Sequence, residues 1–214
     1  MAVLITGANR GIGRALYDHY SAQGKTIGTA RDAGAEFEQL DVRDAASHAA
    51  LAGRLSGVPI DLLVCNAGTY PDKGHKLRGG YPAQMWADTF ATNVTGVFLS
   101  VQSLLDNLAL APAPKIAIIS SQMASQKKAP GGSYIYRSSK AAALNLGRNL
   151  ASDLAPEGIA VGIYHPGWVQ TDMGGAAASI TTHQSRDGLV QRFAELSVAT
   201  TGCFLTWDGQ PHAY

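Results

Sequence analysis

Charged residues are scarce in this sequence, and neither sign predominates. Lys and Arg together number 17 and Asp and Glu 16, so the formal net charge is +1, and only 15% of the 214 residues are charged. Proteins that bind nucleic acids or anionic membranes gather Lys and Arg into clusters that attract phosphates. No long run of basic residues is present, so the sequence predicts neither a nucleic-acid partner nor a membrane partner.

Long apolar segments and paired cysteines are also missing. No stretch approaches the roughly 18 apolar residues of a membrane-spanning helix, and residues 1–7 have no basic residue ahead of their apolar run, unlike a signal peptide. Cys65 and Cys203 lie far apart, and Cys65 sits in an apolar stretch where a buried free thiol is expected. These features indicate a cytoplasmic protein. The six histidines show no ligand spacing with one another or with cysteine, so we expect no metal site.

Glycine is abundant, with 24 residues, and apolar runs of strand length alternate with longer stretches of helical spacing. Strands that are apolar throughout are typical of a parallel sheet covered by helices on both faces. The alternation therefore predicts an α/β fold with a doubly wound parallel sheet. No repeat or linker divides the chain, which indicates a single domain over residues 1–214. The expected strands are residues 2–6, 26–30, 37–40, 60–65, 115–120 and 159–164.

A glycine-rich turn follows the first expected strand and precedes a helical pattern that starts at Arg14. Glycine is needed where the backbone turns sharply or approaches a phosphate, and the start of the next helix offers free N–H groups. The first gap between glycines is one residue wider than in the commoner dinucleotide fingerprint. A plain structural turn would also use glycines, but the strand-to-helix position favours dinucleotide binding by a Rossmann-type sheet. The turn reads Thr6-Gly7-Ala8-Asn9-Arg10-Gly11-Ile12-Gly13.

The end of the second strand carries information about the cofactor. An acidic side chain there would accept hydrogen bonds from the adenosine ribose, whereas a basic one would pair with a 2′-phosphate. Arg31 comes first after Ala30, and Arg10 in the glycine turn could reach the same phosphate. We therefore expect a preference for NADP(H) over NAD(H). Two alternatives stay open: Arg31 and Asp32 are ordinary solvated charges, or a shift of one residue places Asp32 at the ribose.

Tyr136 and Lys140 lie four residues apart at the start of an expected helix, so their side chains share one helical face. A phenol has an unperturbed pKa of about 10, and a nearby cation lowers that value by stabilising the phenolate. The pair is therefore a candidate general acid or base. Taken alone, the same spacing also fits an exposed helical pair with no chemical role.

Seven motifs in order resemble those of the short-chain dehydrogenase/reductase family, from Val3 to about Met173. Residues 136–140, 165–175 and 204–209 are similar to its C-factor/Sniffer-type carbonyl reductase branch. The motifs are the glycine turn, Asp41-Val42, Asn66-Ala67-Gly68, Asn93, Ser120-Ser121, Tyr136 to Lys140, and Pro166-Gly167 followed by Thr171.

This resemblance implies an NADPH-dependent oxidoreductase that transfers hydride between the nicotinamide and a carbonyl or alcohol. Tyr136 would exchange the proton, Ser121 would donate a hydrogen bond to the reacting oxygen, and Lys140 would hold the nicotinamide ribose and lower the pKa of Tyr136. Asn93 would bind a water that links Lys140 to solvent. The resemblance also assigns cofactor binding to Gly7, Asn9, Arg10, Gly11, Ile12, Gly13, Arg31, Asp41, Val42, Asn66, Ala67, Gly68, Tyr136, Lys140, Pro166, Gly167, Val169 and Thr171.

Several of these residues have a structural alternative. Asn93 could be a helix-interior amide that satisfies the backbone, Thr171 could cap a helix, and Asp41 could cap the helix expected from Asp44. Ser121 competes for its role with Ser120, Ser125 and Ser133, and we choose it because it directly follows the fifth strand.

The substrate and the assembly are less well defined by the sequence. The apolar residues expected near the cleft, among them Met123, Tyr134, Trp168 and residues 176–178, predict a small hydrophobic aldehyde, ketone or alcohol. Residues 70–81 and a reduced lid at 174–188 would flank it, within a short substrate-side region at about 174–214. Helices over 83–110 and 134–154 form dimer faces in many members of the family, which implies a homodimer or homotetramer, although some members of the branch are monomers. The alternative function is that of a nucleotide-binding regulatory or signalling protein with little turnover.

Overall fold

Seven parallel strands form one sheet in the computed structural model, which describes residues 1–127 and 129–214. Their order is β3-β2-β1-β4-β5-β6-β7, and all six neighbouring pairs run parallel. The order reverses between β1 and β4, and open α/β sheets bind ligands beyond the carboxyl ends of their strands at such a switch point. The strands are β1 (Val3–Thr6), β2 (Thr26–Ala30), β3 (Glu38–Gln39), β4 (Leu62–Cys65), β5 (Lys115–Ile119), β6 (Ala160–His165) and β7 (Phe204–Thr206).

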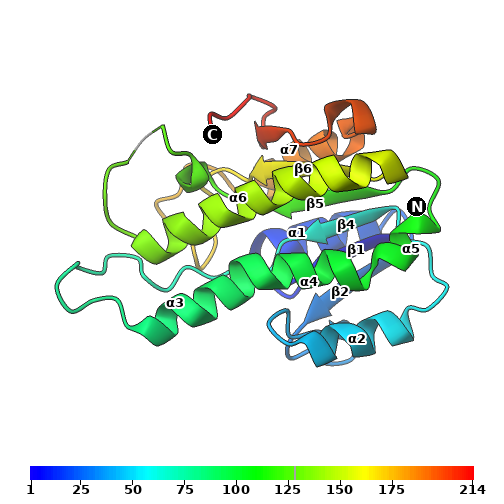
Figure 1. Cartoon of the computed structure of the whole chain (residues 1–214), viewed down its shortest axis with the longest axis horizontal. Helices are drawn as coiled ribbons and strands as arrows, with labels where there is room; N and C mark the ends of the chain where they lie inside the picture. Colours follow the sequence, from blue (N-terminus) through cyan, green and yellow to red (C-terminus); the bar gives the residue numbers. More distant parts are fainter. Residues whose placement is uncertain (128) are drawn as a thin grey trace.

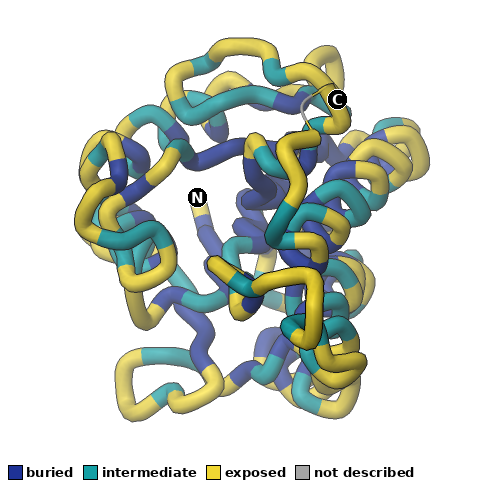
Figure 2. The backbone as a smooth tube through the Cα atoms, turned by 90° about the vertical axis from the view of Figure 1, so that its left-hand side faces the viewer, coloured by how far each residue is buried: buried dark blue, intermediate teal, exposed yellow. Residues whose placement is uncertain are grey.

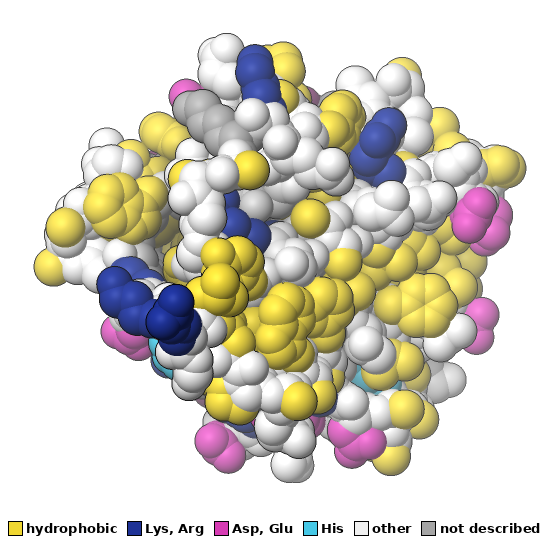
Figure 3. Space-filling view, turned by 60° about the vertical axis from the view of Figure 1, so that its left-hand side comes forward, with side chains coloured by type: hydrophobic (Ala, Val, Ile, Leu, Met, Phe, Trp, Pro, Cys, Tyr) yellow, Lys and Arg dark blue, Asp and Glu magenta, His cyan; other side chains and the backbone are white. Residues whose placement is uncertain are grey.

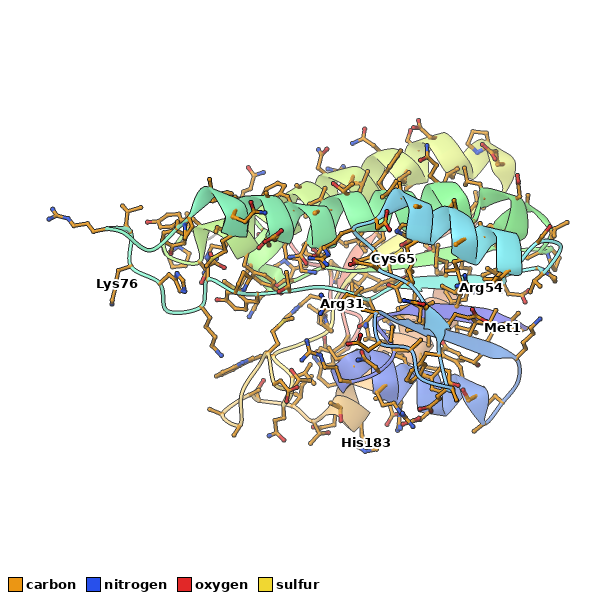
Figure 4. The ribbon with its side chains drawn as sticks, turned by 90° about the horizontal axis from the view of Figure 1, so that it is seen from below. Met1, Arg31, Arg54, Cys65, Lys76 and His183 are labelled. Atoms are coloured by element: carbon orange, nitrogen blue, oxygen red, sulfur yellow. The ribbon has the colours of Figure 1, made fainter. Side chains whose placement is uncertain are left out.

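Helices cover both faces of the sheet (Figures 1 and 4). The first and last helices, α1 (Gly11–Ser21) and α7 (Thr182–Glu195), pack together on one face. This arrangement confirms the predicted doubly wound, Rossmann-type α/β fold. The other face carries α2 (Ala45–Arg54), α3 (Ala83–Phe90), a π-helical turn η1 (Ala91–Thr95), α4 (Gly96–Ser103), α5 (Leu105–Ala109) and α6 (Tyr134–Leu154).

Alternate side chains of the central strands enter two hydrophobic cores, one on each side of the sheet. In β1, Leu4 belongs to the core shared with α2, α4 and α6, whereas Val3 and Ile5 belong to the core shared with α1 and α7. All four residues of β1 and of β4 are buried, and Figure 2 shows the buried backbone running through the middle of the molecule. Burial on both sides explains why these strands are apolar throughout rather than alternating. No helix in the described part of the chain is long and apolar enough to cross a membrane.

The C-terminal third differs most from the sequence-based expectation. β7 was not predicted as a strand, and α7 begins within the segment expected to form a lid. Thr181 caps α7 by accepting a hydrogen bond from the Gln184 amide, while the Gln184 side chain accepts one from the amide of Thr181. Residues 182–188 are therefore the first turns of a helix, which leaves residues 174–181 as the loop.

Candidate active site

The functional side chains gather where the strands end. The strand arrows in Figure 1 point to one edge of the molecule, which Figure 2 views face-on. The glycine turn leaves β1 at this edge, and the loops after β4, β5 and β6 leave it beside the turn, because these strands are neighbours in the sheet. Sequence segments that are far apart are thus brought to one place by the parallel register.

The glycine turn has the geometry of a phosphate cradle. Gly7 and Gly11 adopt positive φ angles of 67° and 56°, which L side chains rarely tolerate. A Cβ at Gly13 would collide with the carbonyl oxygen of Gly7 and the side-chain amide of Asn66. Helix α1 starts at Gly11 without a side-chain cap, so its first N–H groups are left for a ligand. Asn9 and Arg10 are exposed beside the turn, and Ile12 packs against the core shared with α1.

Asn66 supports this turn from the end of β4. Its side-chain nitrogen donates to the carbonyl oxygens of Thr6 and Gly7, both at 3.0 Å. The Thr6 hydroxyl in turn accepts hydrogen bonds from the amides of Asn66 and Ala67. Both N–H groups of the Asn66 side chain are therefore engaged with the protein, and Asn66 shapes the cofactor cradle through the backbone of the turn.

Basic and acidic residues meet near the carboxyl ends of β2 and β3. Arg31 is exposed directly after β2. The Arg43 guanidinium donates to both oxygens of Asp41 and, together with the positive charge of Arg31, lowers the pKa of Asp41 to about 2. The alternative that Asp41 caps α2 is wrong, because Asp44 accepts the hydrogen bond from the Ala46 amide at 2.9 Å.

Val42 follows Asp41 and lies against α4. A Cβ at Gly96 would lie 2.8 Å from the Val42 carbonyl oxygen, so the chain passes close to the helix here. The same carbonyl oxygen is 3.0 Å from Nε2 of the buried His48. These contacts fix the backbone next to the position that the sequence assigns to adenine.

The loop after β6 passes in front of the sheet edge. Pro166 is buried, and its carbonyl oxygen accepts a hydrogen bond of 2.6 Å from the Ser185 hydroxyl of α7. Gly167 has a φ of 91°, where a side chain would collide with Ile180. Val169 is 4% exposed and pairs with Ile180 in an isolated bridge. This part of the loop is therefore firmly placed.

Thr171 lies against the glycine turn. A Cβ at Gly11 would be 3.4 Å from the Thr171 methyl carbon. The Thr171 hydroxyl accepts a hydrogen bond of 3.1 Å from the Gly174 amide, so it caps a turn and not a helix. The next residue, Asp172, lies 3.5 Å from the guanidinium of Arg10. The glycine turn and the loop after β6 thus face each other.

Tyr136 and Lys140 are both buried on one face of α6, with 7% and 5% of their surface exposed. The Lys140 ammonium donates to the carbonyl oxygen of Ile119 at 2.9 Å and lies 5.8 Å from the centre of the Tyr136 ring. The expectation that the two side chains share a face is therefore correct, and the alternative of an exposed helical pair is wrong.

The expected lowering of the Tyr136 pKa does not hold in the cofactor-free chain. Burial raises the pKa of Tyr136 to about 12, and the hydrogen-bonding Ser121 side chain offsets this only partly. Burial also lowers the pKa of Lys140 to about 8. The ammonium lies over the ring, 5.8 Å from its centre, and donates to a carbonyl oxygen, so the loss of water around the phenol dominates.

The structure distinguishes Ser121 from the competing serines. Ser121 is 7% exposed and its side chain interacts with the Tyr136 phenol, while its hydroxyl oxygen accepts a hydrogen bond from the amide of Met123. Ser120 donates to the carbonyl oxygen of Lys140 at 3.2 Å, and the Ser125 hydroxyl is 3.4 Å from a backbone oxygen at the chain end. Of these three serines, Ser121 is the one whose side chain interacts with the Tyr136 phenol.

Asn93 lies in the π-helical turn η1 and is 1% exposed. Its side-chain oxygen accepts from the Thr69 amide at 2.8 Å, and its nitrogen donates to the Thr69 carbonyl oxygen at 2.9 Å and to the Ser139 hydroxyl at 3.0 Å. Asn93 thus satisfies the backbone of another segment and not of its own helix. A Cβ at Gly68 would lie 3.4 Å from the Asn93 oxygen and 3.5 Å from the Lys140 nitrogen, so both groups flank this glycine.

Sequence reasoning missed two residues of the loop after β4. The Tyr70 ring stacks on the Tyr136 ring with centroids 4.0 Å apart, and its hydroxyl lies 2.6 Å from that of Ser133. Asp72 is fully buried and accepts a hydrogen bond of 2.8 Å from the amide of Ile135. Ser133 precedes α6 and resembles a helix cap in sequence, so nothing pointed to a cap supplied by a distant segment.

Figure 3 shows apolar side chains gathered on one face of the molecule. Trp168 and Met173 are 49% and 39% exposed in the loop after β6. A separate open hollow of about 550 Å³ lies between the start of α3 and the outer face of α6. Tyr134, expected at the cleft, lines this hollow, together with Leu77, Gly79, Gly80, Tyr81, Pro82, Trp86 and Ser138.

Residues 1–180 match the sequence profile of the short chain dehydrogenases. The chain belongs to the short chain dehydrogenase family. Among relatives, it is 34% identical to the C-signal of Myxococcus xanthus over 152 residues, which are 71% of this chain and 90% of the relative. Family membership makes the protein an NAD(P)-dependent oxidoreductase and confirms the resemblance found in the sequence.

Solved structures of carbonyl reductases are similar over the whole chain. The NADPH-bound carbonyl reductase from chicken fatty liver is 30% identical with a TM-score of 0.91, over 100% of this chain and 98% of that one. The carbonyl reductase Sniffer of D. melanogaster is 28% identical with a TM-score of 0.90, over 100% and 99%. The fold that positions the site is thus shared with the reductase branch that the sequence resembles.

Proposed function

We propose that this dehydrogenase is an NADPH-dependent carbonyl reductase that also catalyses the reverse oxidation of an alcohol. The observation that carries the proposal is the buried pair Tyr136 and Lys140, with Ser121 and Asn93 beside it, at the sheet edge that holds the glycine turn. The similarity of this chain to solved structures of carbonyl reductases supports the same reaction.

The residues present fit a dinucleotide. The free N–H groups at the start of α1 would hold the pyrophosphate, in a cradle that a side chain at Gly13 would fill. Asp41, Val42 and the segment from Asn66 to Gly68 would adjoin the adenosine. Pro166, Gly167, Val169 and Thr171 would hold the nicotinamide, and Lys140 its ribose. When bound, the reduced cofactor supplies the hydride.

Tyr136 would act as the proton donor in carbonyl reduction. With a pKa near 12 its phenol carries the proton at neutral pH, which is the form an acid needs. Ser121 would donate a hydrogen bond to the substrate oxygen as negative charge develops on it. Lys140 and Asn93, which both flank Gly68, would pass a proton from solvent back to Tyr136 through water.

The finer preferences follow from the charges and apolar groups at the cleft. Arg31, together with Arg10, would pair with a 2′-phosphate and favour NADP(H) over NAD(H). NADPH and NADP are bound in two of the similar structures. Exposed Trp168 and Met173 favour a small hydrophobic carbonyl substrate, with residues 174–214 on the substrate side of a single domain. Assembly as a homodimer or homotetramer remains a prediction.

Replacing Tyr136 with Phe tests the function directly. Tyr136→Phe keeps the buried ring but removes the proton, so kcat for NADPH-dependent carbonyl reduction should fall by about 100- to 10,000-fold. NADPH affinity, measured by fluorescence titration, should stay within about twofold of the wild type. A panel of hydrophobic aldehydes, ketones and quinones supplies the substrates, and full activity in Tyr136→Phe would contradict the proposal.

A second candidate is a nucleotide-binding signalling protein of the same fold, because one relative is named C-signal. The same variant separates the two functions. A biological effect that persists in Tyr136→Phe, in a protein that still binds NADPH but has lost turnover, would favour the signalling function.

A further inference from the structure

Helix α6 lacks a cap of its own. Ser133 occupies the N-cap position but adopts a left-handed conformation with a φ of 47°, and its side chain makes no capping hydrogen bond. Its hydroxyl faces that of Tyr70 instead. The first N–H groups of an α-helix have no partner within the helix and need one from elsewhere when they are buried. Tyr136 is the third residue of this helix.

Asp72 supplies the missing cap from 63 residues upstream of Ile135. One of its oxygens lies 2.8 Å from the Ile135 amide and 3.4 Å from the Tyr136 amide, and the other lies 3.3 Å from the Tyr136 amide. Asp72 is fully buried, so water does not compete for these contacts. The helix dipole also favours a negative charge at this end. Figure 1 shows the chain between β4 and α3 passing the start of α6.

We propose that Asp72 is a positioning residue for Tyr136: its carboxylate holds the backbone of the first turn of α6 and places a negative charge at the end of the helix that carries the phenol. The effect on catalysis rests on the proposed function of Tyr136 as acid and base. Asp72 touches neither substrate nor cofactor, and it acts through the helix that carries the phenol.

The groups that face Tyr136 come from three elements. From the loop after β4, the Asp72 charge and the Tyr70 phenol both raise the pKa of Tyr136. Ser121 from the loop after β5 lowers it, and the Lys140 ammonium of α6 lies over the ring at 5.8 Å. Asp72 and Lys140 thus carry opposite charges beside one phenol. Removing the Asp72 charge should shift the balance toward phenolate.

Two substitutions separate the two roles. Asp72→Ala removes both acceptor and charge, so the first turn of α6 should loosen and kcat should fall by roughly 10- to 100-fold, as expected for a misplaced catalytic group. Asp72→Asn keeps one oxygen acceptor for the Ile135 amide but loses the charge. In the pH–rate profile of Asp72→Asn, the alkaline limb for carbonyl reduction should move to lower pH. Alcohol oxidation, which needs the phenolate, should also begin at lower pH. A merely structural role would lower both rates without moving either limb.

The control is Asp44→Ala, which removes the cap of α2 and its hydrogen bond to the Ala46 amide. It should lower stability while leaving kcat and both pH limbs unchanged. Hydrogen–deuterium exchange of residues 134–140 gives a readout that needs no activity, and exchange should be faster in Asp72→Ala than in Asp44→Ala. If Asp72→Ala does not fold, Asp72→Asn carries both measurements: it keeps an acceptor for the Ile135 amide but loses one of the two oxygens that face the Tyr136 amide, so exchange should be faster at Tyr136.

Two results would overturn the proposal. One is unchanged exchange in the first turn of α6 in Asp72→Ala, and the other is a pH–rate profile of Asp72→Asn whose limbs do not shift. A wild-type protein that reduces no carbonyl compound would refute the proposed function. Faster exchange in Asp72→Ala would then still support the backbone role of Asp72. A kcat that falls while the Michaelis constant for NADPH stays constant supports positioning of Tyr136.

Discussion

The ammonium group of Lys140 is buried in the middle of the site. Few hydrogen-bond partners there replace the water that surrounds this group in the unfolded chain. Its hydrogen bond to the Ile119 carbonyl oxygen compensates only partly, because burial still lowers its pKa to about 8. A buried cation of this kind destabilises the fold at neutral pH. Residues that serve binding and proton transfer are often held at such a cost in stability.

This cost makes stability depend on pH in a defined direction. Below pH 8 Lys140 is charged in both the folded and unfolded chains, and between about pH 8 and 10.5 only the unfolded chain keeps the proton, so the wild type gains stability as pH rises. Lys140→Met has no proton to lose. The wild type therefore gains stability over this range that the variant does not gain. The free energy of unfolding of Lys140→Met minus that of the wild type should fall by about 2 kcal/mol at most between pH 7 and 9.5.

Urea unfolding of the cofactor-free proteins at several pH values measures this difference. Groups common to both proteins cancel in the comparison. Parallel curves for the wild type and Lys140→Met across this range would show that the Lys140 pKa is not lowered.

At the scale of elements, α6 determines the candidate site because it carries Tyr136 and Lys140 and packs on the sheet. Its close approach depends on Gly147, where a Cβ would lie 2.7 Å from a side-chain carbon of Ile163 and 3.0 Å from one of Ile118. Both isoleucines are fully buried and cannot move aside easily. The glycine therefore fixes the depth at which Tyr136 and Lys140 reach the sheet edge.

Two alanine substitutions test this close packing. Gly147→Ala should lower the free energy of unfolding by about 1–3 kcal/mol through overpacking, although alanine favours helices. The matched control is Gly53→Ala in α2, where a Cβ meets nothing within 4 Å. It should raise stability by up to about 1 kcal/mol. Urea unfolding measures both, and a stabilised Gly147→Ala would contradict the packing argument.

At the scale of the whole molecule, the cleft joins segments from both halves of the chain. Arg10 of the glycine turn faces Asp172 of the loop after β6, and Lys73 lies 3.3 Å from the Gly174 carbonyl oxygen. In Figure 4 the labelled Arg31 lies between Lys76 and Met1. A dinucleotide bound across these segments would link them and stabilise the entire fold.

Thermal unfolding should therefore report both binding and cofactor preference. NADPH at about 100 times its Kd should stabilise the wild type by about 2.7 kcal/mol, a rise in Tm of roughly 5–10 °C. NADH at the same concentration should give a smaller rise. Arg31→Asp should abolish the advantage of NADPH, because the carboxylate repels a 2′-phosphate.

Lys25→Asp is the control for the change of charge. Lys25 is exposed just before β2, at the opposite end of the strand from Arg31. It should keep the wild-type difference between NADPH and NADH. An unchanged difference in Arg31→Asp as well would refute the assignment of Arg31.

Much of the fold could be predicted because the residues of a strand indicate whether one or both of its faces are buried. β1 and β4 are buried on both faces, so apolar side chains at every position revealed a covered parallel sheet. β7 could not be found in this way, since it has only three residues and two of them are partly exposed. β3, by contrast, has only two residues and still lies within the strand expected at residues 37–40.

Local chemistry thus determined the glycine turn, the spacing of Tyr136 and Lys140, and the alternation of strands and helices, because each depends on residues close together in the chain. Only the tertiary structure decided the environment of the phenol, the interaction of Ser121 with it and the capping of α6 by Asp72. Burial and contacts between distant segments arise when the chain packs, so they cannot be predicted from the residues that are close together in the sequence.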